Sequence, residues 1–486
     1  MDDFISELRN INTDGLIFEF SKLSIEMFKN DAAVKEIKFP IKHFGIAKFA
    51  RVGLSAWDIP LIEYLSVIHS NDYRRANYLP SLGQLVNSFR KYDNVHSIAP
   101  VIENGNTDVV FRAILGLTAE QFQFQDKSWI FDKINRDYYI LYAAKHFEHH
   151  NTIDTSSIIE EIFGYTVDDY IAVLMMVFGL CYYQPEPLSA LDRLIHLEES
   201  SVLTKENITA LIHHYSCSYN DLRKSRLGKQ LLYSKPFILT QKGSRYISSS
   251  LFLVAMSVAN GLYWSIRDYY FKQNSQSFVN QFGYIFEDYI KDLASRYCEE
   301  GKWRVLPIGK QKGADFYFDF GSLGMLVESK TTLLRLDAKQ QVPNLHSINN
   351  FYQNNIREAY DQLQNSYRQF LPSDIPIIKV ILLYDEFSNT AIMEMSLTEV
   401  FERDSLCYIM TIRDFEILLH LYHNDSVLCS EIIAELAAQA RQEAPHQTID
   451  ALLQSKSLFQ NLHLKGEMDF MSHNLKRFEN ALNEQL

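Results

Sequence analysis

The sequence predicts a multidomain chain that combines a helical domain, an α/β domain and a helical tail. Its 486 residues exceed the size at which a single hydrophobic core stops growing. Apolar residues recur at three- and four-residue spacing through the first half, whereas short β-type runs alternate with helical segments after Gln273. We therefore expect an all-helical domain at 1–272, an α/β domain at 273–428 and a helical tail at 429–486.

In the first half, helical periodicity is clearest at 58–69, 128–149, 156–183 and 250–271. The short apolar run 237–239 has the length of a strand. This half contains no recognisable helix-turn-helix or zinc finger. We expect it to sense a trigger, to bind a partner protein or to drive homo-oligomerisation.

The second half predicts a helix before a hairpin and alternating elements after it. Since helices flank and interrupt the strands, this order indicates an α/β sandwich. The expected elements are a helix at 275–298, strands at 301–308, 314–320 and 325–331, a helix at 355–370, strands at 377–384 and 406–412, and a helix at 414–423.

Cysteine usage and apolar runs bear on the compartment. The five cysteines stand far apart without a CxxC pair, which suits a reducing cytosol. The opening residues MDDFISELRN lack the basic-then-apolar pattern of a secretory signal. The longest apolar run, 170–183, is shorter than the roughly 20 residues that a bilayer span requires. We expect a cytoplasmic protein that does not cross a membrane.

The formal net charge of −13 weakens a nucleic-acid interpretation, because phosphate contacts come from Lys and Arg. The charge is unevenly distributed, however. Residues 280–380 carry 12 Lys and Arg against 12 Asp and Glu, so the acidity belongs to the rest of the chain. A polyanionic ligand is therefore not excluded.

Two β-type runs, 313–320 and 325–330, flank the sequence Gly-Ser-Leu-Gly and predict a hairpin. If the middle two residues of that sequence form a two-residue turn, Asp315 lies opposite Lys330 and diagonal to Glu328. Strand side chains alternate between faces, so all three would project from one face of the sheet.

Two neighbouring carboxylates repel each other unless a cation lies between them. Mg²⁺ prefers oxygen ligands and keeps waters for a phosphate and a nucleophile, with Mn²⁺ as an alternative ion. Lys330 would orient the attacking water or stabilise the transition state. Asp319 shares the face of Asp315 but lies four residues nearer the turn, about 13 Å along the strand. Asp315 is therefore the better partner for Glu328.

Asp315, a 12-residue gap and then Glu328-Ser329-Lys330 resemble the Asp…Glu-x-Lys signature of the PD-(D/E)xK, restriction-endonuclease-like nucleases. The resemblance covers about residues 275–425, although Ala314 stands where the signature has Pro. It implies a restriction-endonuclease-like sandwich in which Asp315, Glu328 and the Ser329 backbone carbonyl hold Mg²⁺. It also implies that Lys330 serves the catalytic water.

Two flanking helices extend this resemblance. Residues 283–290 are similar to the superfamily's first helix, which implies that Glu287 supports the metal through a water. On the downstream helix, relatives place a polar residue that supports the site. Gln362 is the candidate, because it borders the face marked by Ala359 and Leu363.

The function that the resemblance implies is Mg²⁺-dependent hydrolysis of phosphodiester bonds, with DNA favoured over RNA and endonucleolytic cleavage expected. A nuclease fused to an unfamiliar helical domain is similar to bacterial anti-phage or restriction effectors, by analogy alone. The first alternative is a catalytically inactive, restriction-like scaffold or assembly protein.

A second alternative is a metal-independent HEPN-type ribonuclease that uses Arg413 and His420, which lie seven residues apart. It would require the two side chains to meet across a dimer. His146 and His150, at i and i+4, form a weak candidate metal clamp on the predicted helix 128–149.

Overall fold

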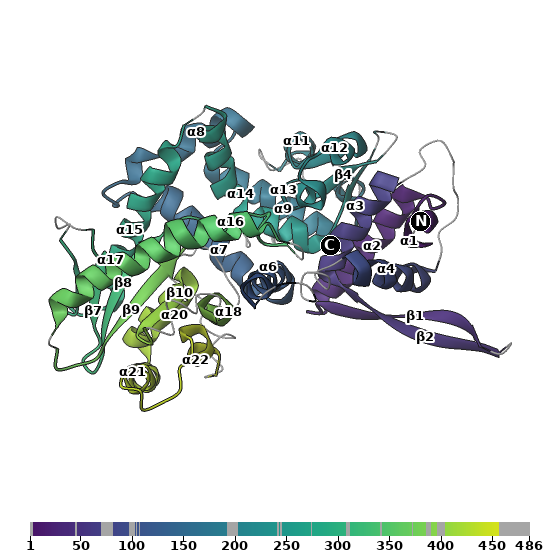
Figure 1. Ribbon diagram of the computed structural model, residues 1–486. Helices are drawn as coiled ribbons and strands as arrows, with labels where there is room; N and C mark the ends of the chain where they lie inside the picture. Colours follow the sequence, from purple (N-terminus) through teal and green to yellow (C-terminus); the bar gives the residue numbers. More distant parts are fainter. Residues whose placement is uncertain are drawn as a thin grey trace.

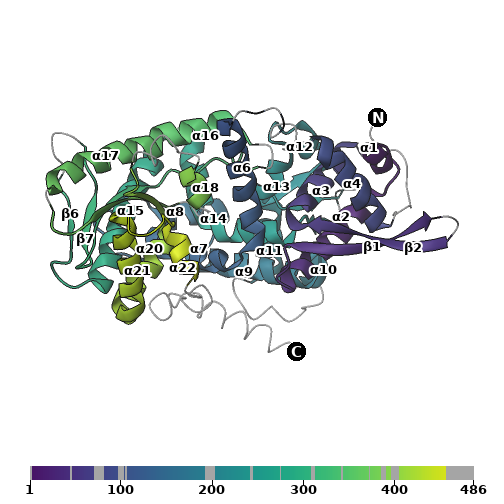
Figure 2. The ribbon, with the colours of Figure 1, turned by 60° about the horizontal axis from the view of Figure 1, so that its bottom comes forward.

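The computed structural model describes most of the chain and shows a mostly helical protein with three β-sheets in the described ranges. A five-stranded sheet lies at one end of the molecule, and a two-stranded ribbon projects from the other (Figures 1 and 2). The described residues are 3–43, 46–69, 81–96, 103, 105, 107–191, 203–240, 243, 245–273, 275–307, 312–340, 343–371, 373–384, 390–395 and 404–455.

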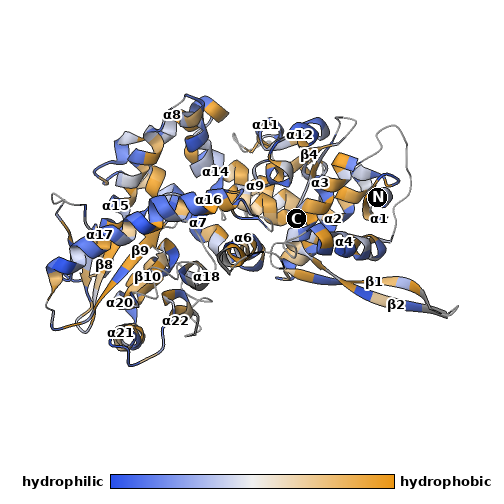
Figure 3. Cartoon of the chain, in the orientation of Figure 1, coloured by the Kyte–Doolittle hydropathy of each residue, from blue (hydrophilic) through white to orange (hydrophobic). Residues whose placement is uncertain are grey.

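Helices make up most of the first half. Most residues of α9, and most of α14 up to Ile266, are buried, and α9 is largely hydrophobic in colour in Figure 3. The helices are α1 (Asp3–Leu8), α2 (Thr13–Lys29), α3 (Ile59–His69), α4 (Leu82–His96), α6 (Thr107–Gln125), α7 (Ser128–Tyr138), α8 (Thr155–Phe163), α9 (Val167–Tyr183), α10 (Pro187–Leu191), α11 (Lys205–His214), α12 (Tyr219–Lys224), α13 (Leu231–Ser234) and α14 (Leu251–Lys272).

The prediction that residues 1–272 are all-helical is wrong. Strands β1 (Val34–His43) and β2 (Ile46–Ser55) form an antiparallel ribbon. Its apolar residues alternate with lysines at period two, a strand signal that the prediction overlooked. A small sheet joins β3 (Ser216–Ser218), β4 (Phe237–Leu239) and β5 (Tyr246–Ser248), and β4 is the strand expected at 237–239.

Two long predicted helices are shorter in the structure. The segment 156–183 divides into α8 and α9 at Gly164, whose φ of 81° ends α8 in the left-handed conformation. The segment 128–149 remains helical only to Tyr138, and a π-helical turn at Tyr139–Ala143 follows before the chain turns away. In both cases the apolar spacing continues across the break, so periodicity alone did not reveal it.

The second half contains the five-stranded sheet, in the order β10-β9-β8-β7-β6. Strands β6, β7 and β8 are antiparallel, whereas β9 runs parallel to β8 and β10 runs parallel to β9. A helical crossover therefore joins β8 to β9, as a parallel pair requires. The strands are β6 (Trp303–Val305), β7 (Phe316–Asp319), β8 (Gly324–Lys330), β9 (Ile377–Leu383) and β10 (Cys407–Thr411).

Helices cover both faces of this sheet. Helices α15 and α20 pack on the face that carries Val327 and Val380, whereas α16 and α17 pack on the face that carries Leu326 and Ile381. Every residue of β9 and β10 is buried, as expected for strands covered on both sides. The helices are α15 (Ser277–Tyr297), α16 (Leu345–Phe351), α17 (Glu358–Tyr367), α18 (Thr390–Met395), α20 (Ile412–Asn424), α21 (Ser426–Ala440) and α22 (Ile449–Ser455).

The C-terminal tail was predicted to be helical from residue 429. The structure places α22 and most of α21 in it, and residues 456–486 lie outside the described part. The domain boundary at 272/273 falls between α14 and α15, whose side chains share one apolar core. The division into domains stays a prediction.

Buried ionic contacts, here called the α7 network, join α7 to the second half of the chain. Arg136 of α7 is fully buried and donates to both carboxylate oxygens of Glu416 on α20, at 2.5 and 2.8 Å. The hydroxyl of Tyr289 on α15 donates to the same carboxylate at 2.6 Å. The positive charge of Arg136 thus balances the negative charge of Glu416, and both carboxylate oxygens accept hydrogen bonds.

The other half of the α7 network lies one turn away. Lys133 donates to both oxygens of the Asp137 carboxylate, at 2.6 and 2.7 Å, and to the Tyr384 hydroxyl at 3.1 Å. Tyr384, which directly follows β9, also donates its hydroxyl proton to Asp137. One ammonium therefore faces one carboxylate, with a phenol between them.

Among the described residues, no single helix is long and apolar enough to cross a membrane. Only the bent pair His150–Phe163 and Val167–Tyr183, whose segments meet at 58°, passes the same test of length and composition.

Candidate functional site

The β7–β8 hairpin brings Asp315 and Glu328 together, but in a register that differs from the predicted one. Asp319 faces Gly324 and Phe316 faces Val327, so the turn contains four residues instead of two. The Asp315 backbone N–H donates to the Val327 carbonyl at 2.9 Å, which places Asp315 beside Glu328. The predicted opposition of Asp315 and Lys330 is therefore wrong by two residues. A two-residue shift leaves each side chain on its own face.

The turn itself explains the correction. Gly321 adopts φ of 81°, a left-handed conformation that glycine reaches without strain. Its N–H donates to the Asp319 carboxylate at 2.8 Å, and the Phe320 N–H donates to the Leu323 carbonyl at 3.0 Å. Asp319 therefore closes the turn and also contacts Lys302 at 3.3 Å. Asp319 lies at the turn end of the hairpin, whereas Glu328 lies near the other end of β8.

Ser329 holds the Asp315 carboxylate in place. Its backbone N–H and its hydroxyl both donate to the same Asp315 oxygen, at 2.8 and 2.7 Å. Burial raises the pKa of Asp315, while these two hydrogen bonds and the nearby Lys330 ammonium lower it. The Ser329 side chain was missed as a site residue, because the sequence assigned it only a backbone carbonyl. Its position between Glu328 and Lys330 was the available signal.

Lys330 joins the hairpin to the helical layer above it. Its ammonium donates to Glu328 Oε1 at 2.8 Å and to Gln362 Oε1 on α17 at 2.8 Å. The structure thus brings the candidate Gln362 to the same ammonium, from the helix that packs against β8. Three predicted side chains from two elements form one hydrogen-bonded chain.

Glu328 is the most constrained acid of the group. It is only 2% exposed, and its second oxygen, Oε2, is buried without a hydrogen-bond partner. Burial, followed by the charge of Asp315, raises the pKa of Glu328 to about 8. A buried acceptor without a partner is costly, so this oxygen requires a proton or a cation.

Glu287 approaches the same place from α15. It is half-buried, and burial together with the negative charge of Asp315 raises the pKa of Glu287 to about 7. Glu287 in turn contributes to the raised pKa of Glu328. The candidate site, here called the acid cluster, therefore contains Asp315, Glu328 and Glu287. The Lys330 ammonium lowers the pKa of Asp315 and Glu328, whereas Lys291 lowers that of Glu287.

The acid cluster is not a preformed cage of close carboxylates. The ligand atoms of Asp315, Glu328 and Glu287 do not all lie within 4.8 Å of one another, a criterion that Glu148, His149 and Asp288 meet among the described residues. Mg²⁺ commonly binds through one or two carboxylates and keeps several waters. Asp315 and Glu328 with waters fit that pattern. The ion would be the partner that the buried Glu328 Oε2 lacks.

The histidine pair proposed as a metal clamp does not lie on an α-helix. His146 lies in a turn, and His150 begins the short 3-10 helix His150–Thr152, so no α-helix provides the predicted i, i+4 spacing. His146 contacts Asp292 at 3.0 Å, and His149 contacts Asp288 at 2.9 Å. These contacts attach the turn to α15.

Arg413 of the HEPN-type alternative is buried in the first turn of α20, directly after β10. Its guanidinium donates to Asp126 at 3.0 Å and to Asp132 at 3.1 Å. His420 lies further along α20 and contacts Asn424 through its ring. Arg413 is thus held by two carboxylates, as in a structural ion pair.

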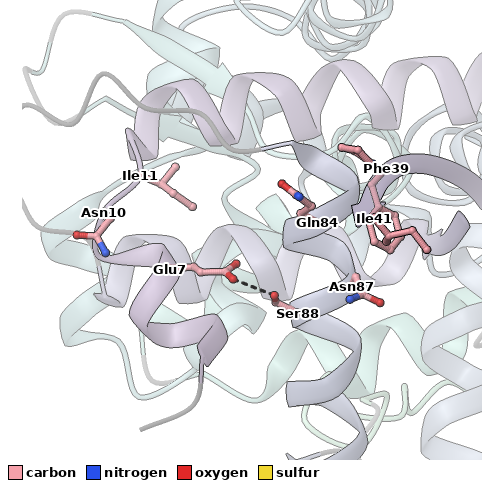
Figure 4. A pocket seen from close by; sticks show the side chains of 9 residues that line it. Glu7, Asn10, Ile11, Phe39, Ile41, Gln84, Asn87 and Ser88 are labelled. Carbon is pink, nitrogen blue, oxygen red and sulfur yellow. Dashed lines mark hydrogen bonds between the residues drawn. The ribbon is translucent and has the colours of Figure 1, made fainter. Parts of the chain in front are cut away.

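A hollow lies between α1, α4 and β1, at the end of the molecule opposite the acid cluster (Figures 2 and 4). Its polar lining consists mainly of the amides Asn10, Gln84 and Asn87, and Glu7 accepts a hydrogen bond from Ser88 at 3.0 Å. The candidate chemistry and this hollow are therefore separate features.

No family model, curated protein or solved structure matched the chain.

Proposed function

We propose that the chain is a Mg²⁺-dependent nuclease that hydrolyses phosphodiester bonds, with DNA as substrate and cleavage within the strand. The observation that carries this proposal is the acid cluster, where the charge of Asp315 raises the pKa of both Glu287 and Glu328, and Glu328 Oε2 lies buried without a partner. Such an imbalance is costly in a site whose purpose is only structural.

The surrounding elements support the proposal. Helix α15, the antiparallel strands β6 to β8, the crossover through α17 and the parallel strands β9 and β10 follow the order expected of a restriction-endonuclease-like sandwich. Asp315 directly precedes β7 and donates its backbone N–H to Val327 of β8, next to Glu328, and Lys330 lies on the same face of β8 as Glu328. We propose this fold identity together with the activity.

Asp315 and Glu328 would hold the ion, with the Ser329 carbonyl as a further ligand and Glu287 acting through a water. The ion supplies charge neutralisation at the phosphate and a water of lowered pKa. Ser329 keeps the Asp315 carboxylate turned into the site. Gln362 fixes the Lys330 ammonium beside Glu328, where it stabilises negative charge developing on the phosphate oxygens.

Proton transfer falls to a group that titrates near neutral pH. The attacking water loses one proton as its oxygen bonds to phosphorus, and the departing sugar oxygen gains one as its bond breaks. Glu287, whose pKa burial and the charge of Asp315 raise to about 7 in the metal-free protein, would accept the first proton. A role as an anti-phage or restriction effector, with the N-terminal half sensing the trigger or driving oligomerisation, stays part of the proposal.

The test is cleavage of plasmid, single-stranded DNA and RNA by the wild type and by Lys330→Ala, each with Mg²⁺ and with EDTA. We expect cleavage of DNA by the wild type with Mg²⁺ and a loss of at least about 100-fold in Lys330→Ala. Asp319→Asn is the matched control, because Asp319 lies on the same hairpin but closes the turn.

Each other result has a definite meaning. Equal cutting by Lys330→Ala would refute the proposal. RNA cutting that resists EDTA and requires Arg413 would favour the HEPN-type ribonuclease. Absence of cutting under all conditions, with Mn²⁺ included, would favour the inactive scaffold.

A further inference from the structure

The β1–β2 ribbon is the most protruding element of the molecule. Its ten residue pairs run from Val34–Ser55 to His43–Ile46, which gives a length of about 33 Å at about 3.3 Å per residue. The ribbon projects from the body at the end opposite β6 and β7 in both views (Figures 1 and 2). An isolated two-stranded ribbon is marginally stable in water, so its base requires support.

The base of the ribbon is attached to α4 on one face. Phe39 and Leu54 are buried there, and a Cβ on Gly83 of α4 would lie only 2.7 Å from that of Phe39. Arg90 of α4 donates to the Gly53 carbonyl at 3.0 Å. The ribbon is therefore held at a defined angle, with its other face open to solvent.

The open face is positively charged. The ribbon contains five Lys and Arg and one Glu, although the chain as a whole carries −13. By strand alternation, Lys38, Arg51 and Glu36 lie on the open face, whereas Lys35 and Lys48 lie on the other. Lys38 and Arg51 are direct cross-strand partners, and both are exposed. Like charges in that position destabilise a strand pair. Glu36 offsets part of this at 3.1 Å from Arg51, but an exposed pair contributes little.

An exposed aromatic ring lies beside these charges. Phe49 is 74% exposed and pairs with Pro40, one step along the same face from the Lys38–Arg51 pair. Lys48, which precedes it, is also exposed but lies on the opposite face of the ribbon. In the free protein, the two basic side chains repel each other and the aromatic ring is exposed to water. A polyanion that also offers apolar surface would relieve both costs.

We propose that the β1–β2 ribbon is an arm that binds duplex DNA, with the ribbon in the major groove and its lysines on the phosphates. The major groove of B-form DNA, about 12 Å wide, admits a two-stranded ribbon, whereas that of A-form RNA is too deep and narrow. Lys38, Lys48 and Arg51 neutralise phosphates, and Phe49 contacts the apolar edges of bases. This inference rests on the proposed function and specifies its substrate.

The position of the ribbon defines what it contributes. Because it lies at the opposite end from the acid cluster, it contacts DNA away from the bond that is cut (Figure 1). Its interactions are the same before and during the reaction. The arm therefore sets affinity and KM and leaves kcat unchanged.

The test is binding of a fluorescent duplex to the full chain in EDTA, followed by anisotropy at several salt concentrations. In the variant Lys38→Gln/Lys48→Gln/Arg51→Gln, we expect binding at least about tenfold weaker. The slope of log K against log salt should fall by about 2 to 3. All three side chains are exposed, so the variant should unfold at the wild-type temperature. Phe49→Ala should weaken binding several-fold with no change in the slope.

A matched control removes three exposed basic residues outside the ribbon: Lys22→Gln/Lys224→Gln/Arg441→Gln. It should bind duplex like the wild type. Equal losses in both triple variants, or an unchanged affinity in the ribbon variant, would overturn the proposal. So would a ribbon variant whose only defect, by sedimentation, is in self-association or in contact with another protein.

Failure of the arm and failure of the nuclease are distinguishable. If the ribbon variant binds DNA normally while cleavage still requires Mg²⁺ and Lys330, only the arm is refuted. If the ribbon variant loses binding but Lys330→Ala cuts like the wild type, only the proposed catalytic site is refuted.

Discussion

The acid cluster and the α7 network are both buried groups of charges, and they differ in balance. In the α7 network, Arg136 faces Glu416 and Lys133 faces Asp137, with each carboxylate also receiving a tyrosine hydroxyl. In the acid cluster, Asp315 and Glu328 share the Lys330 ammonium, and Glu328 Oε2 has no hydrogen-bond partner. Burial of charge alone therefore does not indicate function. The missing counter-charge does.

The largest expected effect concerns catalysis at the unbalanced site. Glu328→Gln keeps the shape of the side chain but removes the charge that would hold Mg²⁺. We expect cleavage to fall by about 10³-fold, measured as single-turnover rates on a duplex. Asp319→Asn should retain the wild-type rate. If the cleavage rate of Glu328→Gln were within a factor of about three of the wild-type rate, the acid cluster would not be catalytic and would not differ in role from the α7 network.

The second effect concerns stability at the balanced site. Arg136→Met leaves Glu416 buried without its counter-charge, which should cost about 3–5 kcal/mol in the free energy of unfolding. The double variant Arg136→Met/Glu416→Leu should recover most of this loss, because neither charge is then left alone. Urea unfolding at neutral pH measures both. A loss below about 1 kcal/mol in the single variant would contradict the assignment of a structural role.

The third effect concerns the response of the metal-free protein to pH. Burial and Asp315 raise the pKa of Glu328 to about 8, so the folded state retains a proton that the unfolded state releases near pH 4.5. This contribution to stability is complete below the unfolded pKa and is lost as pH rises through about 8. In EDTA, the unfolding temperature of the wild type should fall by a few degrees between about pH 6 and pH 9. In Glu328→Gln this decline should be smaller, and an equal decline would count against the raised pKa.

The smallest effect concerns the phenol between Lys133 and Asp137. Tyr384→Phe removes one hydroxyl but leaves the ion pair intact, so we expect a loss of about 1 kcal/mol in stability. Cleavage at saturating substrate should be unchanged, although Tyr384 donates its backbone N–H to the Lys330 carbonyl at 3.0 Å. A fall in the cleavage rate of the folded Tyr384→Phe protein, measured where it remains fully folded, would show that α7 positions Lys330.

Local pattern predicted the acid cluster well and its surroundings less well. The spacing of Asp315, Glu328 and Lys330 indicated a hairpin, and the structure forms one between β7 and β8, with Asp315 directly before β7 and Glu328 and Lys330 on β8. The register was missed because the turn is closed by the Asp319 side chain, a contact that strand alternation does not encode. Because the register shift was an even number of residues, each strand residue stayed on its predicted face of the sheet.

The contacts between the two halves of the chain were beyond prediction. Arg136 and Glu416 lie 280 residues apart, and no local pattern pairs them. The ribbon was missed for a different reason. Its alternation was present between Val34 and Ser55, but the strong helical periodicity around it dominated the interpretation of the first half.

The central claim is that the acid cluster lacks one cation, and the affinity for Mn²⁺ tests it most directly. Calorimetric titration of Mn²⁺ into the wild type, Glu328→Gln and Asp319→Asn compares the unbalanced site with its matched control. We expect a Mn²⁺ site in the wild type that persists in Asp319→Asn and binds at least about tenfold more weakly in Glu328→Gln. Equal affinity in all three proteins, or no binding to the wild type, would contradict it.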